Sequence, residues 1–258
     1  MNIIRYVVLS TVFAFSQISL ATQDGLKIMQ DVKYRDQGLD RFSDVELVQT
    51  MSDGFVRSRS LKMYEKEFGD ERKGLLYFTA PSNTAGTGLL MYSYAEKENK
   101  DDDQWLYLPA LRKVKRIATN SKEGPFLGTD FSFADIERMR LSDYQYQIKK
   151  TEGSVSVIEA KTESGLENPR TGYSKRIVHI DTEKNIILKD EIYRQGRLIK
   201  VFEVVELKKV DGFWTVLEAK MDNLVDGGNT RLIRKNTQYN QELKDGLFNQ
   251  RTLRKGLD

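Results

Sequence analysis

The sequence predicts a mainly β protein: a strongly curved antiparallel sheet that closes a barrel fully or half-way, with a few helices covering its apolar face. About twelve consecutive strand-like stretches are separated by tight-turn dipeptides such as Asp53-Gly54 and Asp211-Gly212. Several stretches reach ten residues or more, and long antiparallel strands twist and coil. Their alternating pattern leaves one face apolar, which must be covered by other parts of the chain.

The N-terminal half is expected to open with a helix. Asp24 can cap residues 25–36, where Leu26, Met29 and Val32 fall on one face. Ser132 and Asp135 then form a capping-box pattern that predicts a short helix over residues 132–140, after an irregular segment at 120–131. Strands are expected between the two helices, at residues 41–52, 55–68, 71–79, 89–94, 104–108 and 113–118.

The C-terminal half reads as a nearly continuous meander. Gln195-Gly196 and Gly227-Gly228 mark further turns. Apolar residues alternate with polar ones, so that Val201, Val205 and Leu207, for example, are expected to share a face. Strands are expected at residues 143–151, 154–162, 173–181, 185–194, 197–208, 213–225 and 229–239.

The first 21 residues have the layout of a secretory signal peptide. Arg5 precedes an uncharged apolar run over residues 7–20, and Ser19 and Ala21 supply the small residues that a signal peptidase needs. The alternative is a retained membrane anchor, but the run is shorter than the roughly 20 apolar residues that span a bilayer. We therefore expect export to the periplasm, cleavage near Ala21, and a single soluble domain over residues 22–258.

Composition argues against most catalytic chemistry. The chain has no Cys and one His, His179, which argues against a cysteine nucleophile, a His-based triad and a His/Cys zinc site. Asp101–Asp103 lacks the alternating carboxylates of a calcium loop, and Gly86-Thr-Gly88 lacks the third glycine of a dinucleotide loop. Paired carboxylates of the glycosidase kind stay open, because nothing singles out one pair among 38 acids. We expect no enzyme, metal or cofactor, and a net charge of +3 gives no strong field for nucleic acid.

Apolar and aromatic residues are concentrated in the middle of the chain. They are either ordinary core or the lining of a cavity for a variable acyl ligand, with residues 124–140 and the helix at 25–36 as its lid. The candidate ligand-binding residues are Phe78, Leu90, Tyr92, Trp105, Tyr107, Phe126, Phe131, Phe133, Ile136 and Met139.

A basic strip follows Pro109. Arg112, Lys113, Lys115 and Arg116 could meet anionic lipid head groups or an acidic partner, or simply form a solvated strand face.

Two groups of motifs suggest a family. LYLPALRKVKRI at 106–117 is followed by GTDFSFAD at 128–135, and FTAP at 78–81 leads to GTGLL at 86–90. Together they resemble the bacterial outer membrane lipoprotein-sorting protein family, distant relatives of the periplasmic lipoprotein carrier LolA. The resemblance extends from the first helix to a tail at 247–253. The key loop arginine of that carrier has no matching position here, so its binding residues are not carried over.

The resemblance implies an unclosed, LolA/LolB-like half β-barrel with helices over its concave face. It also implies a monomeric carrier that moves a lipid or a lipoprotein acyl chain between the inner and outer membranes, with an inner-membrane exporter of the resistance-nodulation-division (RND) type as partner. The alternative is an envelope sensor or scaffold module of the same fold that regulates a membrane complex.

Overall fold

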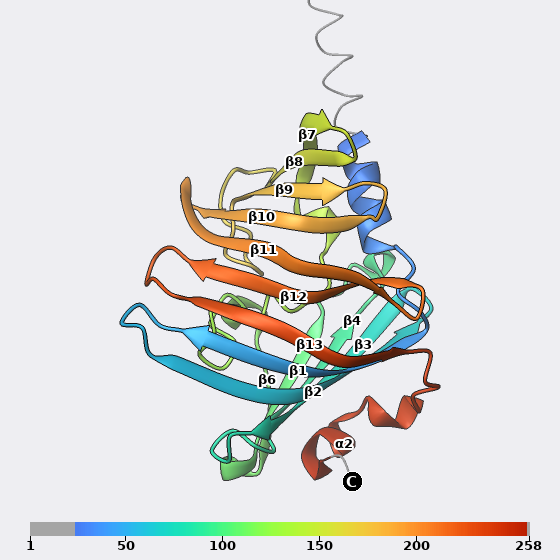
Figure 1. Cartoon of the computed structure of the whole chain (residues 1–258), viewed down its shortest axis with the longest axis vertical. Helices are drawn as coiled ribbons and strands as arrows, with labels where there is room; N and C mark the ends of the chain where they lie inside the picture. Colours follow the sequence, from blue (N-terminus) through green and yellow to red (C-terminus); the bar gives the residue numbers. More distant parts are fainter. Residues whose placement is uncertain (1–23, 257–258) are drawn as a thin grey trace, which may run out of the picture.

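The computed structural model describes residues 24–256, so the predicted signal peptide and its cleavage near Ala21 lie outside the described residues. The described chain forms one thirteen-stranded antiparallel sheet in the order β6-β5-β4-β3-β2-β1-β13-β12-β11-β10-β9-β8-β7 (Figure 1). β6 and β7 are its two edges and do not pair with each other, so the predicted unclosed barrel is confirmed. The described residues contain no helix that is both long and apolar enough to cross a membrane.

The strands are β1 (Asp40–Thr50), β2 (Val56–Phe68), β3 (Glu71–Ala80), β4 (Gly88–Ser93), β5 (Asp103–Leu108), β6 (Lys113–Arg116), β7 (Gln145–Glu152), β8 (Val155–Lys161), β9 (Lys175–Asp181), β10 (Ile186–Arg194), β11 (Arg197–Val210), β12 (Phe213–Asn223) and β13 (Asn229–Tyr239). The helices are an N-terminal helix seen over residues 24–33, α2 (Gln250–Lys255), and the 3-10 turns η1 (Glu96–Glu98), η2 (Pro109–Leu111), η3 (Thr119–Ser121), η4 (Leu141–Asp143) and η5 (Asp245–Leu247).

Two meanders, β1–β6 and β7–β13, make up the sheet, and β1 joins them by pairing with β13. Their hairpins form where the turn dipeptides predict. Gln195 and Gly196 between β10 and β11 both have positive φ angles, 49° and 73°, and so do Asp211 and Gly212 between β11 and β12, at 51° and 87°. This backbone geometry matches the twist of two-residue hairpin turns.

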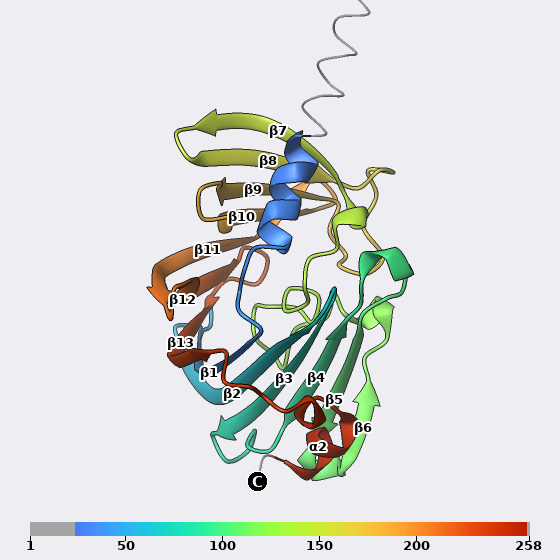
Figure 2. The same ribbon diagram turned by 90° about the vertical axis from the view of Figure 1, so that its right-hand side faces the viewer.

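The concave face of the sheet is covered by the N-terminal helix and by the connection between β6 and β7. Met29 of the N-terminal helix packs on Ile158 and Val178, among other residues of β7–β9. The long connection over residues 117–144 fills the rest of the curve (Figure 2), and its Phe126 and Phe133 pack on β1–β5. The apolar face of the sheet is therefore buried largely under a loop.

The opposite, convex face of β3–β6 is covered by the C-terminal segment. Leu253 of α2 is fully buried against Leu75 and Leu90. Gly88 permits this approach, because a Cβ there would lie 2.8 Å from the Leu253 Cδ1. β4 is consequently buried on both faces, which the alternation pattern does not predict.

Three predictions of local structure are wrong. The N-terminal helix ends at residue 33 rather than 36, and the chain turns after it, where Asp36 Oδ1 accepts a 3.0 Å hydrogen bond from the Gly38 N–H. Val205 is 56% exposed rather than on a buried face, because β11 is bulged there: Val204 and Glu206 pair with Ala219 and Glu218, and Val205 is left unpaired. The third concerns residues 132–140, which form turns and no helix.

The capping box at residues 132–135 forms without its helix. The Asp135 N–H donates to Ser132 Oγ at 3.1 Å, and the Ser132 N–H donates to Asp135 Oδ2 at 2.7 Å. The next amides, however, donate to another segment: Phe133 N–H to the Gly124 carbonyl and Ala134 N–H to the Lys122 carbonyl. In a helix these two amides would be free N-terminal donors, so here their bonds fold the connection back on itself without competing with a helical ladder. Beyond the box the Glu137 N–H donates to the Ala134 carbonyl at 3.3 Å, three residues back, as in a turn.

Candidate functional site

A cavity of about 280 Å³ lies on the concave side, between the 117–144 connection and strands β9–β12. One wall is apolar and includes Phe131, Ile192, Phe202 and Met221. The remaining lining is rich in charge. It comprises Ala134, Asp135, Glu137, Arg138, Met139, Arg140, Asp143, Tyr144, Arg170, Thr171, Arg176, Ile187 and Asp190. The cavity is amphiphilic rather than purely hydrophobic.

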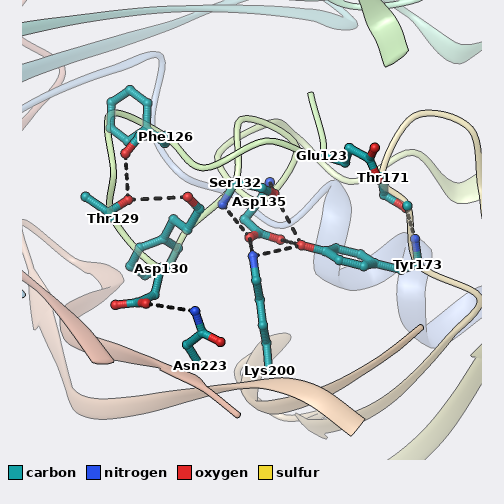
Figure 3. A network of polar contacts seen from close by, with 12 residues as sticks. Glu123, Phe126, Thr129, Asp130, Ser132, Asp135, Thr171, Tyr173, Lys200 and Asn223 are labelled. Atoms are coloured by element: carbon teal, nitrogen blue, oxygen red, sulfur yellow. Dashed lines mark hydrogen bonds and ion pairs between the residues drawn. The ribbon is translucent and has the colours of Figure 1, made fainter. Parts of the chain in front are cut away.

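Asp135 fastens the connection to the sheet beside this cavity. Its carboxylate accepts hydrogen bonds from the Lys200 ammonium at 3.0 Å and from the Tyr173 hydroxyl at 2.8 Å, and Figure 3 shows the three groups converging. Burial alone would raise the pKa of Asp135, but the Lys200 charge and the hydrogen bonds from Ser132, Tyr173 and Lys200 together outweigh it, and the pKa is lowered. Burial and the Asp135 charge raise the pKa of the Tyr173 phenol well above its usual value. The carboxylate therefore stays ionised and the phenol stays protonated.

Asp130 holds the tip of the connection. Its carboxylate accepts from the Thr230 hydroxyl at 2.6 Å and from the Asn223 amide at 3.2 Å, both at the β12–β13 hairpin. Figure 3 shows the contact with Asn223. The Asp130 N–H also donates to Thr230 Oγ1 at 3.1 Å. Asp130 and Asp135 therefore position a loop.

Ion pairs line the rest of the cavity wall. Glu137 pairs with the fully buried Lys122 and, at 3.3 Å, with Arg170. Arg176 of β9 pairs with Asp190 of β10, with Nε to Oδ2 at 2.8 Å. Burial would lower the pKa of Arg176, but the charge of Asp190 and its hydrogen bond together raise it, while burial raises the pKa of Asp190.

The predicted ligand-binding residues separate onto the two faces of the sheet. On the concave side, Phe78, Phe126, Phe133 and Ile136 belong to one apolar cluster, Phe131 and Met139 line the cavity, and Ile136 also packs beside Phe131. On the convex side lie Leu90, Tyr92, Trp105 and Tyr107, which the C-terminal segment covers. The structure thus brings together six of the ten, and a ligand-binding role for any of them stays a prediction.

The basic strip lies at the edge of the sheet. Lys113, Lys115 and Arg116 are exposed residues of β6, and Arg112 occupies the turn before it with a φ of 50°. Arg116 pairs with Asp103 on the neighbouring strand, with Nε to Oδ1 at 2.6 Å. The strip is therefore a solvated edge strand, a position where Lys discourages pairing with other chains.

The remaining candidate residues are Asp101–Asp103 and His179, and their contacts are those of ordinary structural residues. Asp102 and Asp103 accept hydrogen bonds from Tyr94, at its N–H and its hydroxyl, and Asp101 accepts one from Thr119. His179 lines a shallow surface depression on β8–β9 with Val157 and Ile177. Within residues 24–256 no three His, Asp or Glu side chains are grouped as metal ligands.

Sequence analysis missed the charged residues of the cavity, among them Lys200, Arg170, Arg176 and Asp190. One pattern could have indicated Asp190, since it is two residues before the core residue Ile192 in a strand otherwise apolar on that face. A buried carboxylate at an apolar position requires a partner, here Arg176.

An open antiparallel half-barrel with an internal loop and a concave-side cavity defines the class of protein: a LolA-like fold. The chain is 30% identical to an outer membrane lipoprotein-sorting protein domain from Vibrio parahaemolyticus, with a TM-score of 0.81 over 91% of this chain and 100% of that one. It therefore belongs to the outer membrane lipoprotein-sorting protein family.

Two further solved structures and a family model also match this chain. A DUF1329 family protein from Desulfovibrio piger is 27% identical, with a TM-score of 0.83 over 90% of this chain and 99% of that one. A LolA superfamily protein from Nitrosomonas europaea shares the fold, with 19% identity and a TM-score of 0.65 over 89% and 97% of the two chains. A family model described as an uncharacterized protein matches residues 70–255. No curated protein sequence matches.

Proposed function

We propose that this protein is a non-enzymatic periplasmic carrier that binds a lipid or a lipoprotein acyl chain and moves it between the inner and outer membranes. The cavity beneath the connection at 117–144 carries the proposal, together with the sorting-protein relative. Burial of acyl chain would drive binding at roughly 0.8 kcal/mol per CH₂. No covalent step is required.

The cavity's size bears on how cargo would be held. Cavities for small molecules usually measure roughly 300–1,000 Å³, so about 280 Å³ is small for a complete lipid. We infer that residues 124–140 act as the lid and yield when cargo enters. The two carboxylates that fasten this segment, Asp130 and Asp135, are where such a movement would begin.

Lipid mass spectrometry tests the proposal most directly. The mature protein is purified from cells, extracted, and compared with a control protein of similar size and charge processed in parallel. We expect one lipid class to be enriched in stoichiometric amount. A ligand-free extract, combined with failure to take up acyl chains from vesicles, would contradict the proposal.

Localisation and partner need separate experiments. We propose a single domain over residues 22–258, with the signal peptide removed near Ala21 and an RND-type inner-membrane exporter as partner. Intact mass of the periplasmic fraction should show the shortened, monomeric chain. In-cell crosslinking and affinity purification should recover the exporter, and recovery of a transcription-regulating membrane protein instead would favour a sensor.

A further inference from the structure

The cavity wall contains buried polar atoms without partners. Arg170 is 7% exposed, yet its Nε and Nη1 donate no hydrogen bond, and Asp143 Oδ1 lies 3.9 Å from Nη1. Asp190 is 1% exposed, and its Oδ1 accepts no hydrogen bond, because Arg176 engages only Oδ2. An unpaired buried polar group costs free energy, so a polar ligand that hydrogen-bonds to these atoms would be stabilised by that contact.

Arg170 and Asp190 offer complementary hydrogen-bonding groups. Arg170 presents two cationic donors, which suit a phosphate or carboxylate oxygen. Asp190 presents an unpartnered carboxyl oxygen, which suits a hydroxyl or an ammonium group. Both line the same cavity, whose apolar wall includes Phe131, Ile192 and Met221. A ligand that satisfies all three features has an anionic group, a donor group and a hydrocarbon portion.

We propose that this cavity binds the polar head group of a single-chain amphiphile, with its phosphate or carboxylate at Arg170, its hydroxyl or ammonium at Asp190, and the start of its chain on Phe131, Ile192 and Met221. The inference rests on the proposed carrier function and reverses the expected orientation: the head group enters the barrel, where a purely apolar cavity would admit only the tail. The small volume suits a head group and the first carbons of a chain.

Calorimetric titration of the full mature protein tests this with three probes that share a twelve-carbon chain: lauroyl lysophosphatidylethanolamine, laurate and monolaurin, each below its critical micelle concentration. We expect at least about tenfold tighter binding of a charged-head probe than of neutral monolaurin, as charge-assisted hydrogen bonds imply. The ratio of lysophospholipid to laurate affinity separates phosphate from carboxylate as the recognised group.

Arg170→Lys is the test variant, since it keeps the charge beside Glu137 and removes the guanidinium donors. It should lose the tenfold preference and retain monolaurin binding. Arg41→Lys is the matched control: Arg41 is also 7% exposed and ion-paired, but it does not line the cavity, so the preference should survive. If Arg170→Lys does not fold, ¹⁵N NMR of arginine Nε groups in the unmodified protein decides, because lysophospholipid should shift Arg170 and leave Arg41 unchanged.

Equal affinity for all three probes, or an unchanged preference in Arg170→Lys, would overturn the head-group site and leave the carrier function standing. Absence of binding for every probe would overturn both.

Discussion

Glu65 lies within a buried group of arginines on the concave side. Its carboxylate accepts from Arg41 Nε at 2.8 Å and pairs with Arg72 at 3.3 Å. Burial alone would raise the pKa of Glu65, but Arg41, Arg72 and Arg234 hold it well below its usual range. Burial and the charge of Arg41 lower the pKa of Arg35 and of Arg234 to about 10. The Glu65 carboxylate therefore offsets part of the repulsion among these cations.

Glu65→Gln should lower the free energy of unfolding at pH 7 by roughly 3–5 kcal/mol, as breaking a buried ion pair does. Because the folded-state pKa is depressed, the stabilisation is complete above the unfolded-state value of about 4.3 and is lost as pH falls through the folded-state pKa. Urea titrations at pH 7 and at steps below pH 4 should show the two proteins converging.

Glu46→Gln provides the control for this prediction. Glu46 pairs with Lys235 at 2.9 Å, and these side chains are 31% and 59% exposed. Its loss should cost less than about 1 kcal/mol. Equal effects of the two substitutions would show that the arginines around Glu65 do not require its charge.

The C-terminal segment acts as the cover of a second apolar face. Tyr92 donates its hydroxyl to the Phe248 carbonyl at 2.6 Å, and Tyr77 donates to the carbonyl of Leu253. α2 is only six residues long, too short to be stable alone. Its N-cap, Asn249, accepts from the Thr252 N–H at 2.9 Å, and its position depends on what Leu253 buries.

Leu253→Ala should lower the free energy of unfolding by about 2–5 kcal/mol, because it leaves a cavity at a site with no exposure. Thermal and urea denaturation measure the effect. Leu166→Ala removes the same atoms from a residue that is 67% exposed and should change stability by no more than about 0.5 kcal/mol. A loss below 1 kcal/mol at Leu253 would indicate that the segment already detaches in solution.

At the scale of the whole molecule, an open sheet has two unpaired edges that must avoid other chains. β6 carries Lys113, Lys115 and Arg116 outward, and β7 carries Lys149 and Lys150 with an irregular register between Ile148 and Lys150. Charge and bulges are the ordinary means of keeping edge strands from pairing. The basic strip thus has a structural explanation independent of lipid head groups.

Replacing Lys113 and Lys115 together by Thr should promote dimers or larger species, because it removes two exposed charges from the edge and raises its β propensity. Size-exclusion chromatography with light scattering over a concentration series measures this. Replacing Lys208 and Lys209 of the interior strand β11 removes equal charge and should leave the protein monomeric. If both variants stay monomeric and only the first loses binding to anionic vesicles, the strip is instead an interface.

Sequence reasoning predicted the strands because hairpin signals such as Asp211-Gly212 are local. It could not predict that Leu89 and Leu90 are buried on opposite faces of the sheet. The residues that cover Leu90 come from the C-terminal segment, far along the chain. Likewise, Ser132 and Asp135 form their predicted capping bonds, but the chain beyond them makes turns instead of a helix, and backbone bonds to Lys122 and Gly124 hold it in place. The charged cavity depends on contacts between distant strands and the loop, which no local pattern encodes.

The pairing of β1 with β13 limits the order in which the sheet can form during synthesis. Glu46 and Lys235, whose side chains form an ion pair between the two strands, are 189 positions apart in the chain. During synthesis β1 can form a hairpin with β2 early, but its other side stays without a partner until almost the whole polypeptide has emerged. In that interval β1 presents an open strand edge able to capture a neighbouring chain. Nascent chains interrupted before residue 229 should therefore be the most aggregation-prone form of this protein.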